Sequence, residues 1–565
     1  MKKSTCFTLS AALLLVATSA LAQVPPDAGA VKQQVDNSHP AVEQQKKPPP
    51  EISSATGESG KVATGPTVTV TQFNFSGNTL LTTTQLNAVV ARYLNRPLDF
   101  NELQQAALAV ADAYRKAGWI VRAYLPVQTI GKGVVNIAIV EAKFGQTRLQ
   151  GESPHRLAFK RIESIVSAQQ AAGAPLDVNK LDRALLLISD LPGVTVSGNL
   201  AAGKHEGETD LVLRVHDDSP VSGNLTVDNA GSRFTGEGRV AASLYGNSLF
   251  HIGDQISTTL LYAQGINYAQ LAGTAPIGSN GWRLGPHFSY LKYKLIASEF
   301  APLDVKGTST SYGLDTSYPL IRARNKNLYL SFTYDNSSFK NESLGTISTK
   351  YNVNTYEVGL NGHRFDSLGG GGINSAMLSF VAGQANLHGS PNEITDAKTT
   401  KVSGSFNKVR YLFSRQQHLG DRTSLYVGVT GQLASKNLDS SEKFYLGGAS
   451  GVRAYPASEA GGDQGMIANV EGRWRLPHNF SATGFYDWGR ITTNKDNNFT
   501  GAATLNSYNL QGAGVSVGWV SSSGFSIKAT YAHRIGNNPH PASNGNDQDG
   551  SLHKNRFWLQ ASFSF

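Results

Sequence analysis

Two residues in the C-terminal half of the chain have the chemistry to form a specific ion pair. Arg453 lies at the centre of a glycine-rich run that extends from Phe444 to Gly465. Asp487 lies further along, in a run with aromatic neighbours from Gly484 to Gly489. A bidentate pair between a guanidinium and a carboxylate would fix the glycine-rich run in place. The spacing also allows a solvated loop in which neither charge is paired, which is the usual state of isolated Arg and Asp residues.

The sequence offers no convincing catalytic or metal-ligating set. The stretch from Gly57 to Lys61 is similar to a phosphate-binding loop, but Val62 follows the lysine and no strand precedes it. His205-Glu206 lacks the second histidine of the zinc-protease spacing. There is also no Gly-x-Ser-x-Gly nucleophile motif. We therefore predict a protein that is not an enzyme and that binds no metal ion or other cofactor.

The composition is polar but weakly charged. Only 16% of the residues are charged, whereas the chain has 58 Gly, 21 Tyr and 24 Phe. The formal net charge is +9, yet Lys and Arg are scattered without a basic cluster, so we expect no nucleic-acid partner. Abundant glycine and aromatic residues with few charges are typical of a membrane β-barrel that has aromatic girdles.

The first 66 residues predict a targeting segment followed by a linker. Residues 1–22 contain Lys2 and Lys3, an apolar run, and Ala20-Leu21-Ala22, which is the pattern of a cleaved signal peptide. The chain's one cysteine, Cys6, lies in this segment. Residues 23–66 are rich in Pro and Gln and have too few large apolar residues for a core, so we expect a linker with a short helix near Asp27 to Ser38.

Two small α+β units are predicted next, at residues 67–142 and 143–217. In the first, Asp99 and Glu102 have capping-box spacing, and Gly118 ends the helix that they begin. Two strands are expected after it, at 119–127 and 134–140. In the second unit Asp177 precedes a helix with Leu181 inward. The shared β-α-α-β-β order indicates two copies of one module.

Beyond residue 217 the helical periodicity gives way to short alternating runs. At about 20 residues per strand and connection, residues 218–565 predict about 16 antiparallel strands. A closed barrel of that size encloses a wide polar lumen. The last nine residues alternate strictly, which predicts the closing strand of an outer-membrane barrel. The residues expected on its lipid face are Phe557, Leu559, Ala561, Phe563 and Phe565, and those on its polar face are Trp558, Gln560, Ser562 and Ser564.

Several stretches resemble the two-partner secretion transporters, the TpsB family, of the ShlB/FhaC/HecB haemolysin secretion/activation type, within the BamA-like superfamily. The matching stretches of the two α+β units are 114–119 with 123–126, and 181–186 with 191–194, which resemble POTRA domains. The run Gly451, Val452, Arg453, Ala454 and Tyr455 resembles the V-R-G-Y motif at the tip of the family's sixth extracellular loop. Residues 484–489 resemble the strand whose aspartate receives that arginine.

The resemblance implies a transmembrane β-barrel of about 16 antiparallel strands, preceded by two periplasmic α+β POTRA domains. It also favours the ion pair between Arg453, on a loop folded into the lumen, and Asp487 on the barrel wall. Ala454 departs from the pattern, which usually has glycine at this position. A left-handed backbone at Ala454 would be strained.

The function implied by the resemblance is export of one unfolded partner, a TpsA-like protein of adhesin or haemolysin type, across the outer membrane without ATP. The POTRA domains would recognise the partner, and a short helix after Gln23 would occupy the lumen at rest, although residues 23–66 could equally serve as a plain tether. We expect a monomer in contact with outer-membrane lipid, inserted by the barrel assembly machinery. The alternatives are an assembly factor of the same superfamily, whose members usually carry more POTRA modules, and a passive porin.

Overall fold

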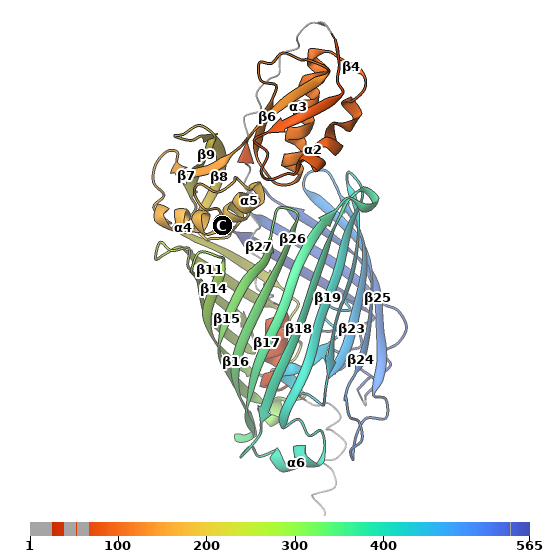
Figure 1. Ribbon diagram of the computed structural model, residues 1–565. Coiled ribbons are helices and arrows are strands. Elements are labelled where there is room, and N and C mark those ends of the chain that lie inside the picture. The colour runs from red at the N-terminus through yellow and green to blue at the C-terminus, as the bar shows by residue number, and fades with distance from the viewer. Residues whose placement is uncertain (1–24, 39–51, 54–66, 543) are drawn as a thin grey trace, which may run out of the picture.

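The computed structural model describes residues 25–38, 52–53, 67–542 and 544–565 (Figure 1). The predicted signal peptide, and residues 23–24, 39–51 and 54–66 of the predicted linker, lie outside these ranges. No helix within the described ranges combines the length and the apolar character needed to cross a bilayer. The described residues form a short N-terminal helix, two α+β units and a closed β-barrel.

The first α+β unit packs two helices against a three-stranded sheet in the order β3-β6-β5. The capping box of α3 is present as the sequence predicts, with the Asp99 side chain accepting from the backbone N–H of Glu102 at 2.8 Å. One face of α3 is buried, because its apolar residues recur at helical spacing. The strand expected at 119–127 is shorter at both ends: residues 119 and 120 bridge to the second unit, and residues 125–127 do not pair in the sheet. The elements are β2 (Val68–Thr69), β3 (Gln72–Ser76), α2 (Thr83–Val90), η1 (Ala91–Tyr93), β4 (Pro97–Leu98), α3 (Phe100–Lys116), β5 (Val121–Tyr124) and β6 (Val134–Glu141).

The second α+β unit repeats this topology. Its sheet has the order β7-β9-β8, so in both units the last strand lies between the first strand, to which it is parallel, and the middle strand, to which it is antiparallel. The short strand β1 (Ile52–Ser53) adds to the outer edge of β8 in parallel orientation. The elements are β7 (Lys143–Leu149), α4 (Phe159–Gln169), α5 (Val178–Ser189), β8 (Val194–Ala202) and β9 (Glu208–Asp217).

The barrel is a single closed antiparallel sheet of 16 strands. It closes where β10 pairs with β27, from Asn224 opposite Ser564 to Asp228 opposite Gln560. Its strands are β10 (Val221–Asp228), β11 (Arg239–Asn247), β12 (Gln255–Ala263), β13 (Ile266–Ile277), β14 (Trp282–Lys294), β15 (Lys306–Arg322), β16 (Lys326–Ser343), β17 (Thr346–Asp366), β18 (Gly372–Asn386), β19 (Gly404–Gly420), β20 (Thr423–Ala434), β23 (Gln464–Arg475), β24 (Phe480–Thr492), β25 (Ser507–Val520), β26 (Phe525–Arg534) and β27 (Asn555–Ser564).

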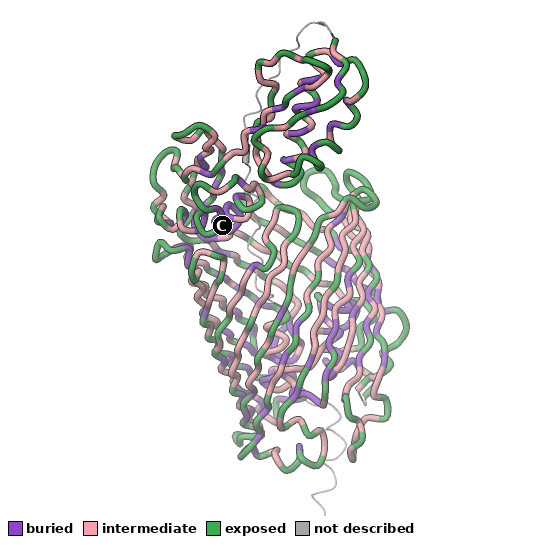
Figure 2. The backbone as a smooth tube through the Cα atoms, viewed as in Figure 1, coloured by how far each residue is buried: buried purple, intermediate pink, exposed green. Residues whose placement is uncertain are grey.

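The two faces of the barrel wall differ as the alternation predicts. On the closing strand, Phe557, Leu559 and Phe563 are exposed on the outer surface, and Phe565 is exposed just after it. Trp558 points the other way and lines the lumen. In Figure 2 the buried residues gather in the cores of the two α+β units and inside the part of the barrel away from them. An apolar outer face with a polar bore is the arrangement of a barrel set in lipid.

The two ends of the barrel are built differently. The end next to the α+β units has mostly tight turns, whereas the far end has long loops, one of which carries α6 (Glu393–Lys398) (Figure 1). Four far-end loops matter below: L1 (229–238), L3 (295–305, with η2, Ala301–Leu303), L6 (435–463) and L8 (535–554). L6 contains η4 (Ser440–Glu442), β21 (Phe444–Tyr445) and β22 (Gly461–Gly462), and the near-end turn after β17 contains η3 (Leu368–Gly370).

The second α+β unit is anchored to the near rim of the barrel by ion pairs. Arg322, at the end of β15, donates to both carboxylate oxygens of Asp190, at 2.8 and 2.6 Å. Arg324, in the following turn, holds Asp182 of α5 in the same way, at 2.9 and 2.8 Å. Bidentate pairs of this kind restrict orientation as well as distance. The unit is therefore held at a fixed angle over the mouth of the barrel.

Replacing both anchoring carboxylates, in Asp182→Asn with Asp190→Asn, should loosen the second unit. We expect the contact to weaken by about 1–2 kcal/mol, because two partly exposed charge-assisted pairs are lost. Spin labels on Lys204→Cys and Ser367→Cys, in exposed turns of the unit and of the near rim, would report a narrow distance distribution that broadens in the double variant. The matched control is Asp112→Asn, whose exposed partner Arg115 lies on the same helix. An unchanged distribution would show that the ion pairs do not set the angle.

Candidate functional site

A helix from the N-terminal segment lies inside the barrel. Helix α1 (Ala28–Ser38) contacts η4 and strands β14, β15 and β16 (Figure 1). Its apolar stripe, Ala28, Val31 and Val35, is fully buried in a cluster that includes Tyr293 and Phe339 of the barrel wall. The spacing of three and four residues places these side chains on one helical face. The sequence predicts a helix in this segment, and the structure places it in the lumen.

Polar contacts fix the first turn of α1. The backbone N–H of Ala28 donates to Oδ1 of Asn341 at 2.8 Å. The Ser440 hydroxyl of loop L6 donates to Oδ1 of Asp27 at 2.6 Å, and the Gln33 amide donates to the carbonyl of Lys443 at 3.1 Å. The helix is therefore held partly by the wall and partly by L6.

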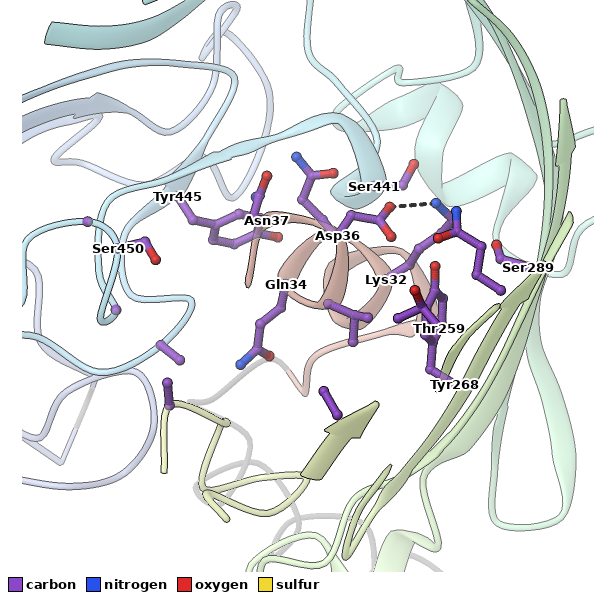
Figure 3. Close-up of a pocket in the computed structure, with 18 of the residues that line it drawn as sticks. Lys32, Gln34, Asp36, Asn37, Thr259, Tyr268, Ser289, Ser441, Tyr445 and Ser450 are labelled. Carbon is purple, nitrogen blue, oxygen red and sulfur yellow. Dashed lines mark hydrogen bonds and ion pairs between the residues drawn. The ribbon is translucent and has the colours of Figure 1, made fainter. Parts of the chain in front are cut away.

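The opposite face of α1 borders a polar cavity of about 1280 Å³ (Figure 3). Lys32, Gln34 and Asp36 face it, and Lys32 pairs with Asp36 at 2.6 Å. Across the cavity the wall presents mainly hydroxyl, amide and charged side chains. A bore with this lining is hydrated, because polar groups in it need water or protein partners. Wall residues of this kind include Ser243, Thr259, Gln270, Ser311, Thr355 and Lys528.

Loop L6 folds back into the same lumen as a hairpin. Its strands β21 and β22 pair through Phe444 opposite Gly462. Glycines allow the tight packing: a Cβ at Gly451 would lie 2.0 Å from the carbonyl oxygen of Leu446, so no side chain fits there. Val452 is fully buried in a cluster with Leu446 and residues of β23 to β26. The glycine-rich composition of the run follows from this close backbone contact.

The structure brings together Arg453 and Asp487, the two charged residues that the sequence singles out. Nε of Arg453 donates to Oδ2 of Asp487 at 2.9 Å, and Nη2 donates to Oδ1 at 2.6 Å. The backbone N–H of Arg453 also donates to Oδ2, at 3.0 Å. The Asp487 side chain is completely buried and that of Arg453 is 8% exposed. The loop tip is thus joined to β24 by three charge-assisted hydrogen bonds.

Further residues complete this arginine site, and sequence reasoning missed them. Nη1 of Arg453 pairs with Glu471 on β23 at 2.9 Å, and the guanidinium lies 3.5 Å from the ring centroid of Phe485. The Asn469 amide donates to Oδ1 of Asp487 at 2.7 Å. Trp558 of β27 donates its indole N–H to the Arg453 carbonyl at 2.8 Å. The sequence did hold a signal for two of these residues. Asn469 and Glu471 are two residues apart on one strand, so both point to the same face, and this strand pairs with β24.

The charges of the arginine site are balanced as a group. Arg453 contacts two carboxylates, and the second of them, Glu471, is also paired with Arg473 at 2.7 Å. Removing one member of a buried ion pair leaves the other charge without compensation, which typically costs 3–5 kcal/mol. Arg453, Asp487 and Glu471 should therefore behave as one unit.

The remaining motif residues correct one expectation. Ala454 is not in the left-handed region, so the strain considered for alanine at this position is absent. The position that requires glycine is Gly512 of β25, which packs against Ala454. A Cβ at Gly512 would lie 2.5 Å from Cβ of Ala454. Tyr455 is buried, with the Arg534 guanidinium 4.2 Å from its ring centroid.

Comparison with known families gives two matches. The sequence model described as haemolysin secretion/activation protein ShlB/FhaC/HecB matches residues 207–519. The model described as POTRA domain, ShlB-type, matches residues 68–142, which is the first α+β unit.

Curated relatives match over much of the chain. The heme/hemopexin transporter protein HuxB of Haemophilus influenzae (strain 86-028NP) is 28% identical over 561 residues, which cover 96% of each chain. The outer membrane transporter CdiB of Dickeya dadantii (strain 3937) is 25% identical over 455 residues, covering 78% of this chain and 79% of that protein.

Two solved structures share the fold. CdiB from Escherichia coli superimposes with a TM-score of 0.72 at 20% identity and covers 96% of this chain and 100% of its own. BamA from Haemophilus ducreyi, lacking POTRA domains 1–3, gives a TM-score of 0.52 at 13% identity, covering 88% of this chain and 100% of its own. At these identities the likeness concerns the fold alone.

The arginine site predicts that Arg453→Ala releases the tip of L6 without unfolding the barrel. Loss of the guanidinium leaves Asp487 and Glu471 buried without a counterion, so the local stability of the loop should fall by about 3–5 kcal/mol. Hydrogen exchange of the backbone amides of residues 445–460 should become roughly a hundredfold faster or more.

The control for this experiment is Arg490→Ala, an exposed arginine on the same strand as Asp487. It should leave the exchange of L6 unchanged. Equal protection of L6 in the parent and in Arg453→Ala would contradict the anchoring role of the ion pair.

Proposed function

Because the chain belongs to the haemolysin secretion/activation protein family ShlB/FhaC/HecB, we propose that it is the outer-membrane pore through which one unfolded partner protein reaches the cell surface. The protein is an outer-membrane β-barrel transporter of the TpsB type, with its POTRA region in the periplasm. The observation that carries the proposal is a wide polar bore that is occupied by α1 and L6, two segments that are not strands of the wall. A pore closed by removable segments suits a large cargo better than a permanently open porin.

Recognition of the partner would take place on the sheets of the two α+β units, both of which we take to be POTRA domains. In the first unit β3 and β5 are the outer strands of the main sheet. In the second unit the outer strands are β7 and β8 when the added strand β1 is left out. An extended peptide can add to such an edge through main-chain hydrogen bonds, with little demand on its sequence. The pairing of β1 with β8 supports this proposal, because the edge of β8 already accepts a parallel strand from this chain.

The path of the partner would run from the second unit into the barrel. The ion pairs of Asp182 and Asp190 hold that unit on the rim formed by β15 and its following turn. A peptide bound to the unit would therefore stay close to the mouth. The hydroxyl and amide side chains of the bore would form hydrogen bonds to a passing backbone that water can replace. The partner would therefore not bind tightly to the wall.

Direction would come from the partner itself. We propose that no nucleotide hydrolysis drives transport, since the sequence has no phosphate-binding loop in a strand-loop-helix context. A β-helical adhesin or haemolysin that folds outside buries apolar surface there, and the folded form no longer fits the bore. Folding on the outer side would thus prevent return.

For the pore to open, α1 must leave its position between the barrel wall and L6. Burial of Val31 and Val35 contributes roughly 3–6 kcal/mol as an upper estimate, and the polar contacts of Asp27 and Gln33 can be exchanged for water. This is a modest hold for a segment of 11 residues. Binding of a partner could displace it.

The proposal is tested by deleting the gene for this protein and following one candidate secreted partner together with the bulk outer-membrane barrels. We expect loss of the partner from the surface with normal barrels, and full restoration by the parent protein. Arg453→Ala and Asp487→Ala should restore little secretion while showing heat-modifiable migration of a folded barrel in detergent gels. A general loss of barrels would favour an assembly factor, and normal secretion by both variants would remove the ion pair from the mechanism.

The seat of α1 predicts a change in conductance. Val31→Glu with Val35→Glu places two charges in the buried apolar cluster and should release the helix, because each unpaired charge is costly to bury. In planar lipid bilayers we expect the open conductance to rise severalfold. The matched control is Gln34→Glu with Asn37→Asp, two changes on the face toward the cavity. Equal conductance in both double variants would show that α1 does not close the bore.

A further inference from the structure

The C-terminal arm of loop L6 has a second set of contacts, on the far side from the arginine site. Glu459 is 1% exposed, and no Lys or Arg among the described residues forms an ion pair with it. Its Oε1 accepts from the Asn538 amide at 2.8 Å, and its Oε2 accepts from the backbone N–H of Gln548 at 2.8 Å. The backbone N–H of Ala460 donates to Oε1 of Gln548 at 3.2 Å. All three contacts join L6 to loop L8, which connects the last two strands of the barrel.

The same segment of L8 is held by a buried ion pair from β26. Asp547 is completely buried, and its Oδ2 accepts from Nη2 of Arg534. Its Oδ1 accepts from the Asn538 amide at 2.9 Å, which is the amide that also binds Glu459. The guanidinium of Arg534 lies over the ring of Tyr455 in L6, 4.2 Å from the centroid. Arg534 therefore contacts L6 directly through Tyr455 and indirectly through Asp547 and Asn538.

These contacts form a closed circuit that begins and ends in L6. It runs from Tyr455 to Arg534, then to Asp547 and Asn538, and returns to L6 at Glu459. The circuit shares no hydrogen bond with the arginine site. Arg453 joins the tip of L6 to β23 and β24, whereas the circuit joins the following residues to β26 and L8.

We infer that Arg534 and Asp547 are positioning residues that hold the C-terminal arm of L6 in the lumen, as a second anchor independent of Arg453. The inference rests on the proposed function, in which L6 closes part of the pore. The two anchors hold the hairpin at neighbouring positions: the first at Arg453, and the second at Tyr455 and Glu459. Release of one anchor leaves the loop attached but able to swing about the other.

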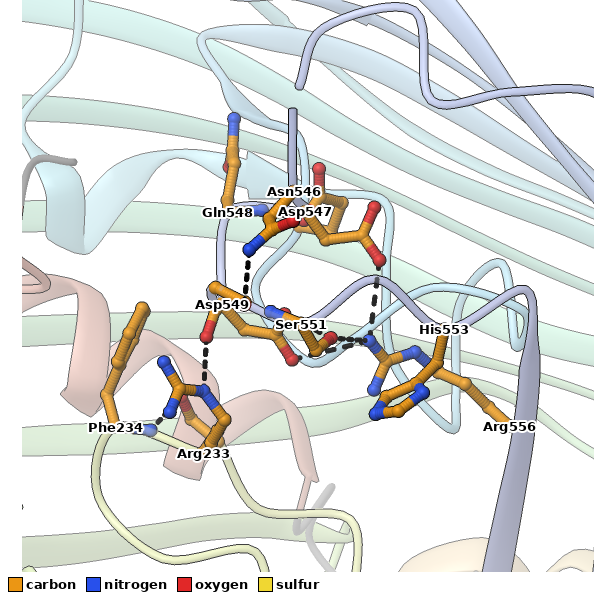
Figure 4. Close-up of polar contacts among 12 residues, drawn as sticks. Arg233, Phe234, Asn546, Asp547, Gln548, Asp549, Ser551, His553 and Arg556 are labelled. Carbon is orange, nitrogen blue, oxygen red and sulfur yellow. Dashed lines mark hydrogen bonds and ion pairs between the residues drawn. The ribbon is translucent and has the colours of Figure 1, made fainter. Parts of the chain in front are cut away.

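The second anchor continues across the closure of the barrel. Asp549 of L8 pairs with Arg556 at the start of β27, at 3.3 Å, and its carbonyl accepts from Nε of Arg233 in L1 at 2.5 Å (Figure 4). Arg233 also pairs with Glu299 of L3. The strands that close the barrel, β10 and β27, pair over a short register. The polar network therefore connects L8 to L1 and L3, on the other side of that closure.

The burial of the pair separates this anchor from an ordinary surface contact. The Arg534 and Asp547 side chains are 2% and 0% exposed, and the arginine is stacked on an aromatic ring as well as paired. A buried pair of this kind loses little to screening by salt. Asp547 also lies 3.5 Å from Nη2 of Arg556, so Arg534→Gln leaves that carboxylate with one cation, whereas Asp547→Asn leaves the buried Arg534 guanidinium without its carboxylate partner. The pair contacts L6 directly at Tyr455, a residue of the predicted motif.

The test measures the position of L6 in the full-length protein in the outer membrane. The one native cysteine is Cys6, so Ala457→Cys, between Tyr455 and Glu459, serves as a reporter for a membrane-impermeant maleimide added to intact cells. We expect Arg534→Gln and Asp547→Asn each to raise the labelling rate roughly tenfold or more, because the arm then opens more often. Arg534→Lys keeps the charge but loses the planar guanidinium that lies over Tyr455, so its labelling rate should fall between those of Arg534→Gln and the parent.

Secretion of the partner should fall in Arg534→Gln and Asp547→Asn and recover in part in Arg534→Lys. Lys398→Cys, in exposed α6, controls for the amount of protein at the surface, and heat-modifiable migration controls for folding. Should Arg534→Gln fail to fold, the isosteric Asp547→Asn decides.

Labelling at position 457 that stays at the parent rate in both variants, while Arg453→Ala raises it, would overturn the inference. Parent-level secretion in variants whose reporter labels quickly would support the second anchor and contradict the proposed role of L6 in closing the pore. The labelling result does not depend on which partner is exported. Failure of the deletion experiment would refute the proposed function, whereas a labelling rate that does not change would refute the second anchor alone.

Discussion

The need to pair every backbone group in the membrane determines the rest of this structure. A sheet in hydrocarbon cannot leave an edge unpaired, so the 16 strands must close, and here they do so between β10 and β27. A closed sheet of this size encloses far more space than its own inward side chains can fill. The bore is therefore polar and hydrated unless other segments of the chain enter it. Helix α1 and loop L6 are those segments, and both are held by side chains and not by the ladder of the sheet.

Buried charge is the means by which L6 stays in the lumen. The arginine site and the L8 circuit both place guanidinium groups against carboxylates that are almost fully removed from water. Such pairs add little net stability compared with an apolar core. Breaking one of them is costly, because the remaining partner is then a buried charge without a counterion. In the proposed function, such pairs would keep L6 in the lumen until a partner arrives.

The two α+β units bring a different kind of interaction to the near end. Their sheets offer outer strands for main-chain pairing, and the ion pairs of Asp182 and Asp190 fix the second unit over the mouth. Recognition through backbone hydrogen bonds is tolerant of sequence, which suits an extended cargo. In the proposed function, specificity for one partner would then come from side chains next to those strands. The repeated topology of the units shows how one small fold supplies two such surfaces in series.

The sequence by itself determined the elements whose patterns are local. Alternation of period two gave the strands and the lipid face of Phe557, Leu559, Phe563 and Phe565, and the spacing of Asp99 and Glu102 gave the start of α3. The pairing of Arg453 with Asp487 came from the motif, since spacing alone left both charges free to be solvated. Only the tertiary structure decided which further groups meet at that site, because Glu471, Phe485 and Trp558 arrive through strand register and barrel closure. The same holds for the glycine requirement opposite Ala454, which lies at Gly512, and for the circuit through L8. A register is a relation between segments far apart in the chain, and no local pattern encodes it.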